Sequence, residues 1–256
     1  MSFNPVKIKA IEKHSDRLLF LSVEKPLCLK FTPGQFVRIG LALRSPVQSD
    51  EDILARPYSV ASAPAANQLD FYIARVTEGE LSGQFFDLNV GDTIYVDDEA
   101  YGLMNPQRLQ PHGHLVCMGT GTGVSAFLSI LKSNPWDRFE KVTVIHCARY
   151  AADLTVTHRF QEAAMDLQQE HNFQFIRLTT RETDENSQGE LQGRLTETIQ
   201  NGKLQEFGIE PNPEKSRIIL CGNPEFVSSM KKLLKMKGFT APRGEKFGTL
   251  ISESFW

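Results

Sequence analysis

Short apolar runs separated by turn signals dominate residues 1–107. These runs are rich in aromatic and β-branched side chains, and glycine, proline or aspartate bounds them. They predict strands at 6–10, 18–23, 36–40, 69–76 and 93–96. Residues 81–88 predict one short helix crossing the end of the sheet. Several short strands at such close spacing are typical of a small barrel, so we expect an N-terminal antiparallel β-barrel domain over residues 1–107.

The pattern changes after Pro106, where apolar strands begin to alternate with helical segments. The predicted strands are 114–118, 141–147, 173–178 and 217–221, and the predicted helices are 124–132, 155–169 and 224–237. Asn223 is a suitable N-cap for the last helix, Pro224 suits its first position, and Gly238 follows its end. Alternation of this kind favours a parallel sheet, so we expect a Rossmann-like α/β domain over residues 108–256.

Composition and charge exclude several classes of protein. The chain has 256 residues, of which 41% are apolar and 23% charged, with a net charge of −3. These values are ordinary for a globular protein and argue against a strongly basic nucleic-acid binder. We expect no membrane span, because no apolar stretch is long enough, and the N-terminus lacks the apolar core of a signal peptide. The predicted location is therefore cytoplasmic, with neither nucleic acid nor membrane as a partner.

The cysteines are scattered along the chain as Cys28, Cys117, Cys147 and Cys221. None forms a CxxC pair, so the spacing predicts neither a zinc site nor an iron–sulfur cluster, and no metal site is expected. Reduced thiols in a cytosol fit this distribution.

A glycine-rich turn follows the strand at 114–118. Gly121, Gly123 and Ala126 satisfy the pattern GxGxxG/A between a strand and a helix. Such a turn allows backbone to approach a pyrophosphate, and the helix start favours its negative charge. The alternative is a tight strand–helix connection that needs glycine for backbone reasons alone.

An arginine lies at the strand end where an NAD-binding domain would carry an acid, and two more arginines follow later in the chain. The strand at 141–147 leads into Ala148 and Arg149 without a carboxylate, and Arg181 and Arg194 lie in later loops. A cation suits the 2′-phosphate of NADP, whereas a carboxylate would repel it. Taken singly, each arginine could equally be a solvated surface residue.

The segment Arg56-Pro57-Tyr58-Ser59 combines groups suited to a nucleotide with a flat ring system. Arg56 offers a bidentate donor for phosphate, Tyr58 a ring for stacking, and Ser59 a hydroxyl near a ring nitrogen. The alternative is a barrel strand with one surface arginine.

Together these motifs resemble the ferredoxin–NADP⁺ reductase family over nearly the whole chain. Residues 56–59 resemble its flavin signature RxYS, and the glycine turn and Cys221-Gly222-Asn223-Pro224 resemble its two other signatures. Residues 146–154, 180–183 and 255–256 resemble the bacterial ferredoxin/flavodoxin–NADP⁺ reductase subgroup.

The resemblance implies roles for individual residues. The residues implied to hold FAD are Arg56, Pro57, Tyr58, Ser59, Tyr72, Ile73, Ala74, Gly79, Glu80, Leu81 and Ser82. The last four would start the short helix whose N-terminus faces the pyrophosphate. The residues implied to hold NADP are Thr122, which would also touch the flavin, Ala148, Arg149, Thr180, Arg181, Arg194, Asn223, Pro224 and Glu225. The C-terminal tail with Phe255 and Trp256 would return to the flavin.

The implied activity is an FAD-dependent oxidoreductase that moves electrons between NADPH, as hydride to flavin N5, and a one-electron carrier. That carrier would be ferredoxin or flavodoxin, bound transiently by a monomer. Ser59, Cys221 and Glu253 are the candidate catalytic residues, whereas His146 is expected to be a packed strand residue. The alternatives are an NAD(P)H–flavin reductase, an oxygenase reductase component of the same architecture, and a non-catalytic binding protein on this fold.

Overall fold

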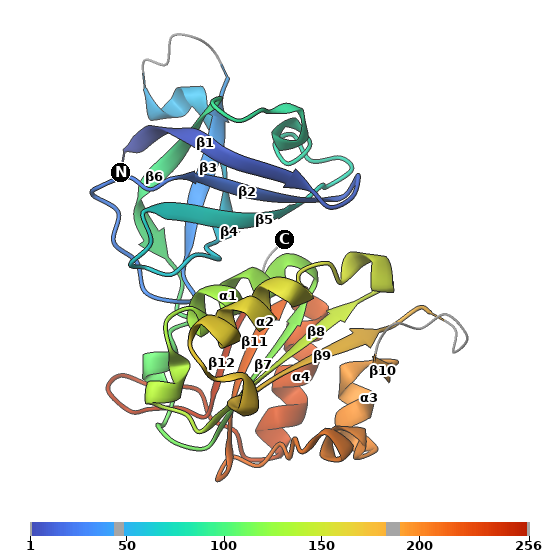
Figure 1. The fold of residues 1–256 in the computed structure, drawn as a ribbon. Helices are drawn as coiled ribbons and strands as arrows, with labels where there is room; N and C mark the ends of the chain where they lie inside the picture. Colours follow the sequence, from blue (N-terminus) through green and yellow to red (C-terminus); the bar gives the residue numbers. More distant parts are fainter. Residues whose placement is uncertain (1, 44–48, 183–189, 255–256) are drawn as a thin grey trace. The chain divides into compact units, whose positions relative to one another are not determined.

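The computed structural model describes residues 2–43, 49–182 and 190–254 (Figure 1). The chain divides into two compact units, Met1–Gly102 and Leu103–Trp256. The boundary expected after residue 107 lies in the same connecting segment, between strands β6 and β7.

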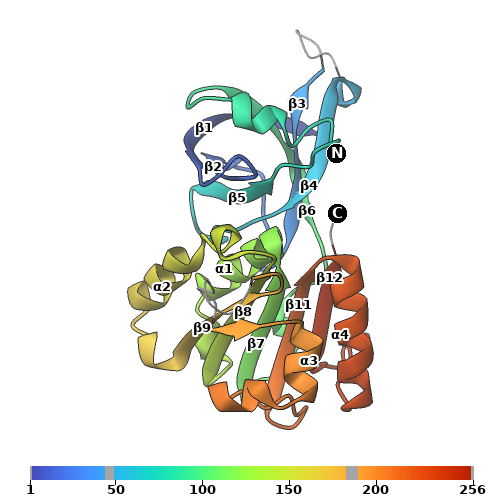
Figure 2. The same ribbon diagram turned by 90° about the vertical axis from the view of Figure 1, so that its right-hand side faces the viewer.

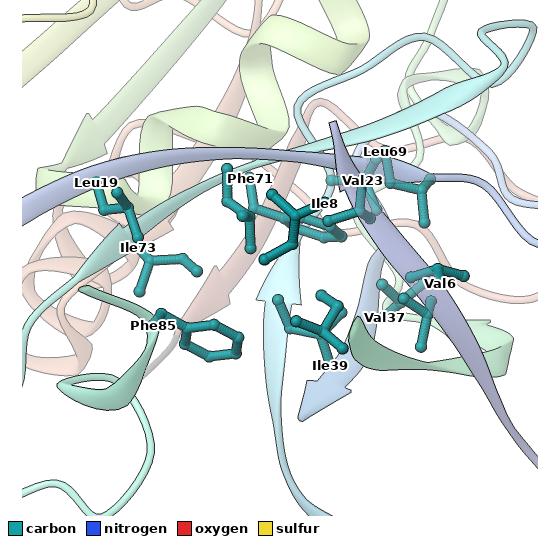
Figure 3. Close-up of a cluster of buried hydrophobic side chains, with 14 of the residues drawn as sticks. Val6, Ile8, Leu19, Val23, Val37, Ile39, Leu69, Phe71, Ile73 and Phe85 are labelled. Atoms are coloured by element: carbon teal, nitrogen blue, oxygen red, sulfur yellow. The ribbon is translucent and has the colours of Figure 1, made fainter. Parts of the chain in front are cut away.

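The first unit is a six-stranded antiparallel sheet with strand order β4-β3-β6-β1-β2-β5. Its strands are β1 Phe3–Lys13, β2 Leu18–Glu24, β3 Phe36–Ala42, β4 Ile53–Ser59, β5 Gln68–Ala74 and β6 Thr93–Tyr101. Alternating apolar side chains from β1, β2, β3 and β5 meet inside the curved sheet, as Val6, Ile39 and Phe71 illustrate in Figure 3. The predicted strands are confirmed, and the segment containing Arg56 is strand β4.

The sheet does not close into the complete barrel that the sequence predicts. Strands β4 and β5 end the sheet on opposite sides, and no strand pairing joins them in the described residues. The N–H of Ala61, just after β4, donates to the carbonyl of Asp70 on β5 at 2.8 Å. Pro57 in the middle of β4 has no N–H to contribute to a further ladder, which confines this strand to an edge.

The prediction of a helix at residues 81–88 is wrong. The structure has turns up to Gly83 and then a single 3₁₀ turn, Gln84–Asp87. Hydrogen bonds of the i→i+3 type build it, including Gln84 N–H to the Leu81 carbonyl at 2.9 Å. The side chain of Ser82 accepts from the N–H of Val76 at 2.9 Å and bends the chain back, so Gly79 to Ser82 do not start a helix.

The second unit is a parallel six-stranded sheet of order β10-β9-β8-β7-β11-β12, flanked by helices (Figure 2). Its strands are β7 His114–Thr120, β8 Lys141–Ala148, β9 Phe173–Thr179, β10 Leu191–Gln192, β11 Ser216–Gly222 and β12 Leu250–Ser254. Its helices are α1 Ser125–Leu131, α2 Thr157–Asp166, α3 Leu195–Gln200 and α4 Pro224–Met236. The predicted strands and helices are confirmed with shorter helix bounds, whereas β10, β12 and α3 were not predicted.

Helix α4 begins and ends where the sequence predicts. The side chain of Asn223 accepts hydrogen bonds from the N–H groups of Glu225 and Phe226, at 2.8 and 3.2 Å. Gly238 follows the helix with a φ of 93°, the left-handed conformation that ends many helices. Among the described helices, none is both long and apolar enough to cross a bilayer.

Candidate active site

Strand β4 presents the first signature segment. Arg56 and Tyr58 are two residues apart on β4, so their side chains project from the same face. The Tyr58 ring packs edge-on against Phe85 with centroids 5.8 Å apart, and burial raises its pKa to about 12, so the hydroxyl stays neutral. The guanidinium of Arg56 is half exposed and lies 3.4 Å from the carboxylate of Glu80.

Strand β5 presents the second predicted flavin segment at the other end of the same sheet. Tyr72 is 3% exposed, and its ring lies 5.3 Å from Phe20 and 6.1 Å from His14, which stacks on it. Both β4 and β5 are end strands, so each has one backbone edge without a strand partner in the described part of the chain. The contact of His14 with Tyr72 was not predicted, because it joins the turn after β1 to strand β5, which is distant in sequence.

The glycines of the turn after β7 have different surroundings: two are tightly packed, and one has open space where a side chain would stand. A Cβ at Gly119 would lie 2.7 Å from the Phe127 ring, and one at Gly123 would lie 2.9 Å from the backbone of Cys221. Two of the glycines therefore serve close packing, as the alternative interpretation of the turn holds. Gly121 differs, because its φ is 53° and no atom lies within 4 Å of a Cβ placed there.

The third signature segment crosses directly over this turn. The N–H of Asn223 donates to the side-chain oxygen of Thr120 at 2.9 Å, and a Cβ at Gly222 would overlap that oxygen. Cys221 lies beside Gly119 in the β7–β11 register and beside Glu253 in the β11–β12 register. The carboxyl ends of β7, β11 and β12 thus bring these two signatures and Glu253 together.

Burial sets the protonation of the two candidate catalytic groups on this side. Cys221 is fully buried, and burial, together with the neighbouring Glu253 carboxylate, raises the pKa of its thiol, which therefore stays protonated. Burial also raises the pKa of Glu253 to about 7, although a hydrogen bond from the backbone of Leu103 opposes the shift. The Oε2 atom of Glu253 is buried and has no hydrogen-bond partner among the described residues. Ser59 lies in the first unit, at the end of β4.

The predicted phosphate-binding arginines follow neighbouring strands. The N–H of Arg181, after β9, donates to the carbonyl of Arg149, after β8, at 3.0 Å. Gly193, directly before Arg194, donates to the Thr179 carbonyl at 2.9 Å. All three arginine side chains are exposed, and no described ion pair involves them. The structure therefore gathers three cations at the carboxyl edge of the sheet.

Two further residues support these loops. The carboxylate of Glu182 accepts from the N–H of Ala151 at 2.9 Å, which ties the loops after β8 and β9 together. His146 is 2% exposed, as expected of a packed strand residue, and its ring nitrogen Nε2 contacts the Gly121 carbonyl. Neither contact was predicted, since each joins segments that are distant in sequence.

The sequence also predicted reduced cysteines, no metal site and a C-terminal aromatic tail. The four cysteines are free. Within the described residues, no group of three or more His, Cys, Asp or Glu side chains is arranged to hold a metal ion. Phe255 and Trp256 lie outside the described residues.

Known proteins resemble this chain over most of its length. The family model of the oxidoreductase NAD-binding domain matches residues 117–232. A flavodoxin/ferredoxin–NADP reductase of Escherichia coli (strain K12) is 34% identical over 223 residues, covering 86% of this chain and 85% of the relative. A ferredoxin–NADP reductase of Azotobacter vinelandii is 30% identical over 264 residues, covering 99% and 98%. The crystal structure of a ferredoxin NADP⁺ reductase from Neisseria gonorrhoeae with bound FAD and NADP superposes with a TM-score of 0.86, at 30% identity and 99% coverage of both chains.

The fold and the paired signatures define an oxidoreductase with an antiparallel β unit and a nucleotide-binding α/β unit. Identity and coverage of this extent place the chain in the flavodoxin/ferredoxin–NADP reductase family. The family predicted from the sequence is thereby confirmed, and the protein is an enzyme.

Proposed function

We propose that this chain binds FAD along β4 and β5 and transfers electrons between NADPH and a one-electron carrier, ferredoxin or flavodoxin. One observation supports this most directly. The two segments expected to hold the flavin, on β4 and β5, occupy the two end strands of one sheet, where strand pairing leaves backbone groups available. The names of the related proteins agree with this activity.

The residues of the first unit fit FAD. Arg56 has a half-exposed guanidinium that lies 3.4 Å from the exposed carboxylate of Glu80, so an incoming pyrophosphate can take the place of that carboxylate. Tyr58 offers a ring held from one side by Phe85. We assign to FAD the set predicted from the sequence, which is Arg56, Pro57, Tyr58, Ser59, Tyr72, Ile73, Ala74, Gly79, Glu80, Leu81 and Ser82.

The residues of the second unit fit NADP(H). The left-handed Gly121 has open space where a side chain would stand, so backbone can approach a ligand closely there. The exposed guanidinium groups of Arg149, Arg181 and Arg194 suit a 2′-phosphate. The assigned set is Thr122, Ala148, Arg149, Thr180, Arg181, Arg194, Asn223, Pro224 and Glu225. The tail residues Phe255 and Trp256 are assigned to the flavin.

When bound, NADP(H) and FAD supply the two-electron exchange, and FAD supplies the single-electron steps to the carrier. The chain's own residues bind, orient and move protons. Glu253 is poised to exchange a proton at Oε2 near neutral pH, because its pKa is about 7. Cys221 stays a neutral thiol beside it and presents a small uncharged side chain. Ser59 offers a hydroxyl to the flavin ring.

The same proposal includes the lifetime of the carrier complex, the oligomeric state and the location of the protein. The complex with the carrier is transient, since electron-transfer partners must separate after each turnover. The chain is a monomer, which light scattering tests. It works in the cytoplasm, and its four free cysteines suit a reducing compartment.

The experiment has two stages. The purified chain should carry one FAD, identified by chromatography after acid release, and its yellow colour should bleach with NADPH. NADPH-dependent reduction of cytochrome c should then rise on addition of ferredoxin or flavodoxin. A colourless chain contradicts the flavin proposal, and efficient turnover with free flavin but with neither carrier identifies a flavin reductase instead.

A matched pair of variants tests the flavin residues. Arg56→Ala should weaken FAD binding about 10- to 100-fold, the loss expected for a charge-assisted contact to phosphate. Glu80 is assigned to FAD through its backbone, which Glu80→Gln keeps; the variant removes only the carboxylate that now faces Arg56, so it should bind FAD at least as tightly as the wild type. Equal weakening by both variants would show that Arg56 does not hold the pyrophosphate.

A further inference from the structure

Strands β8 and β9 lie side by side (Figure 1), and their backbone pairing continues into the loops that follow them. The regular register ends at Ala148 and Thr179. Beyond it, the N–H of Thr180 donates to the Ala148 carbonyl, and the N–H of Arg181 donates to the Arg149 carbonyl, both at 3.0 Å. The backbones of two of the arginines assigned to the 2′-phosphate are therefore in direct contact.

The side chain of Glu182 continues this pairing where the backbone contacts end. Its Oε1 atom accepts a hydrogen bond from the N–H of Ala151 at 2.9 Å. Ala151 begins the 3₁₀ turn Ala151–Asp153, and Tyr150, directly before this turn, provides no side-chain cap. Glu182 thus satisfies an N–H group that the start of such a turn leaves without a partner in the turn itself.

The charge of Glu182 is unfavourable at this place. The two loops are proposed to bind a phosphate group, which a neighbouring carboxylate repels. In the described part of the chain, no ion pair joins Glu182 to Arg149 or Arg181. The Oε2 atom of Glu182 is buried and has no hydrogen-bond partner among the described residues. The contact that explains a carboxylate here is therefore the hydrogen bond to Ala151, for which the charge is not needed.

We propose that Glu182 is a positioning residue that sets the preference for NADPH over NADH by holding the loops of Arg149 and Arg181 together. This inference rests on the proposed function, which assigns both arginines to the 2′-phosphate. Both guanidinium groups are exposed at the ends of long side chains, so the position of the backbone decides where they reach. Loops that are already joined lose less conformational entropy when the phosphate binds. NADH has no 2′-phosphate and gains nothing from this order.

Removal of the acceptor tests the proposal in the FAD-loaded enzyme. With ferricyanide as electron acceptor, Glu182→Ala should lower kcat/KM for NADPH about three- to tenfold and change kcat/KM for NADH less than twofold. The Kd of 2′-AMP, measured by calorimetry, should rise by the same factor as kcat/KM for NADPH falls. Glu182→Gln keeps the Oε1 acceptor and removes the charge, so it should bind 2′-AMP at least as tightly as the wild type.

Removal of the donor tests the same hydrogen bond from its other end. Ala151→Pro has no N–H and suits this position, because proline is favoured at the first position of a helical turn. Tyr150 already has the extended conformation that a following proline requires, with φ −132° and ψ 153°. The variant should show the same selective loss as Glu182→Ala. The combined variant should lose less than twofold more than either one, since both remove one bond.

A control removes a similar contact elsewhere. The carboxylate of Asp92, in the first unit, accepts a hydrogen bond from the N–H of Asn89 at 2.7 Å. Asp92→Ala should change neither kcat/KM for NADPH nor that for NADH. Three results would overturn the proposal: equal losses for NADPH and NADH in Glu182→Ala, equal weakening of 2′-AMP binding by Glu182→Ala and Glu182→Gln, or additive losses in the combined variant. If Glu182→Ala does not fold, Ala151→Pro and Glu182→Gln carry the same test.

The arginine variants separate this proposal from the proposed function. If Arg149→Ala and Arg181→Ala lower kcat/KM for NADPH and NADH equally, the assignment of the 2′-phosphate in the proposed function is contradicted. If both arginine variants are selective for NADPH while Glu182→Ala keeps the wild-type values for NADPH, NADH and 2′-AMP, only the positioning role of Glu182 is overturned.

Discussion

The imidazole Nε2 of His146, on β8, lies 3.1 Å from the carbonyl oxygen of Gly121 in the glycine turn. A carbonyl oxygen only accepts hydrogen bonds, so Nε2 carries the proton and donates it. Burial lowers the pKa of His146 to about 4, which keeps the ring neutral at pH 7. A side chain from the neighbouring strand thus fixes the peptide at the one glycine of the turn whose Cβ position is open.

The first prediction concerns the stability of wild type and His146→Gln between pH 6.5 and 4. The unfolded chain takes up the proton near pH 6.5, whereas the folded chain takes it up only near pH 4. This histidine therefore stabilises the fold fully above pH 6.5, and the contribution falls by about 3 kcal/mol as the pH drops to about 4. Urea unfolding should show a shallower pH dependence in the variant, by about one proton.

Two other histidines serve as references for that measurement. His114 has a pKa of about 4 as well, through burial and the nearby Lys141, so some pH dependence should persist in His146→Gln. His171 is exposed, and His171→Gln should follow the wild type. An unchanged slope in His146→Gln would show that this ring takes up its proton at the same pH in the folded and the unfolded chain.

The second prediction concerns the crossing of the third signature over the glycine turn. Gly222→Ala adds a Cβ that overlaps the Thr120 side-chain oxygen, at a φ of 133° that disfavours any side chain. Steric overlap and backbone strain together should cost about 2–4 kcal/mol of unfolding free energy. Gly244→Ala is the matched control, because its φ of 55° brings strain but no atom within 4 Å. Equal losses in urea unfolding would show that the crossing is looser than described.

The sequence predicts those parts of the molecule that depend on neighbours along the chain. The caps of α4 follow from Asn223, Pro224 and Gly238 because capping acts within one helical turn. The helix expected at 81–88 does not form, because the Ser82 side chain accepts a hydrogen bond from the Val76 N–H and the chain tightens into a 3₁₀ turn; the apolar pattern carries no sign of this side-chain contact.

The rest of the site could not be predicted, because it depends on pairing between distant segments. Cys221 and Glu253 meet through the register of β11 and β12, and the short strand β12 gives only a weak pattern. Asn223 reaches Thr120 from a position 103 residues further along the chain. Motifs therefore supplied the candidate residues of the site, whereas the contacts between them required the fold.

The third prediction tests the arginines at the carboxyl edge of the sheet. Arg181→Ala or Arg194→Ala should raise the KM for NADPH about 10- to 100-fold, since each charge-assisted contact to phosphate contributes about 1.5–3 kcal/mol. The KM for NADH should change little, because NADH has no 2′-phosphate. Arg243→Ala changes an exposed arginine in another loop and should leave both values unchanged. Equal effects on NADPH and NADH would show that these arginines do not recognise the 2′-phosphate.

The last prediction concerns Glu253, whose folded-state pKa of about 7 lies above its ordinary value of 4.5. A carboxyl group with a raised pKa is compatible with the fold when protonated, so its charge destabilises the protein progressively as the pH rises from 4.5 through 7. Glu253→Gln mimics the protonated form. It should match the wild type below pH 4.5 and be more stable above pH 7 by about 1–2 kcal/mol, a value reduced for partial exposure to solvent.

A second readout separates proton exchange by Glu253 from a purely structural role. If this carboxyl group exchanges a proton during turnover, the pH profile of NADPH–ferricyanide activity has a break near pH 7 that Glu253→Gln removes. Glu245→Gln, in an exposed loop, should keep both the break and the wild-type stability curve. Glu253→Gln could instead gain stability above pH 7 and keep the break in the activity profile. The break would then come from another group, so the carboxyl group of Glu253 would destabilise the fold without exchanging a proton during turnover.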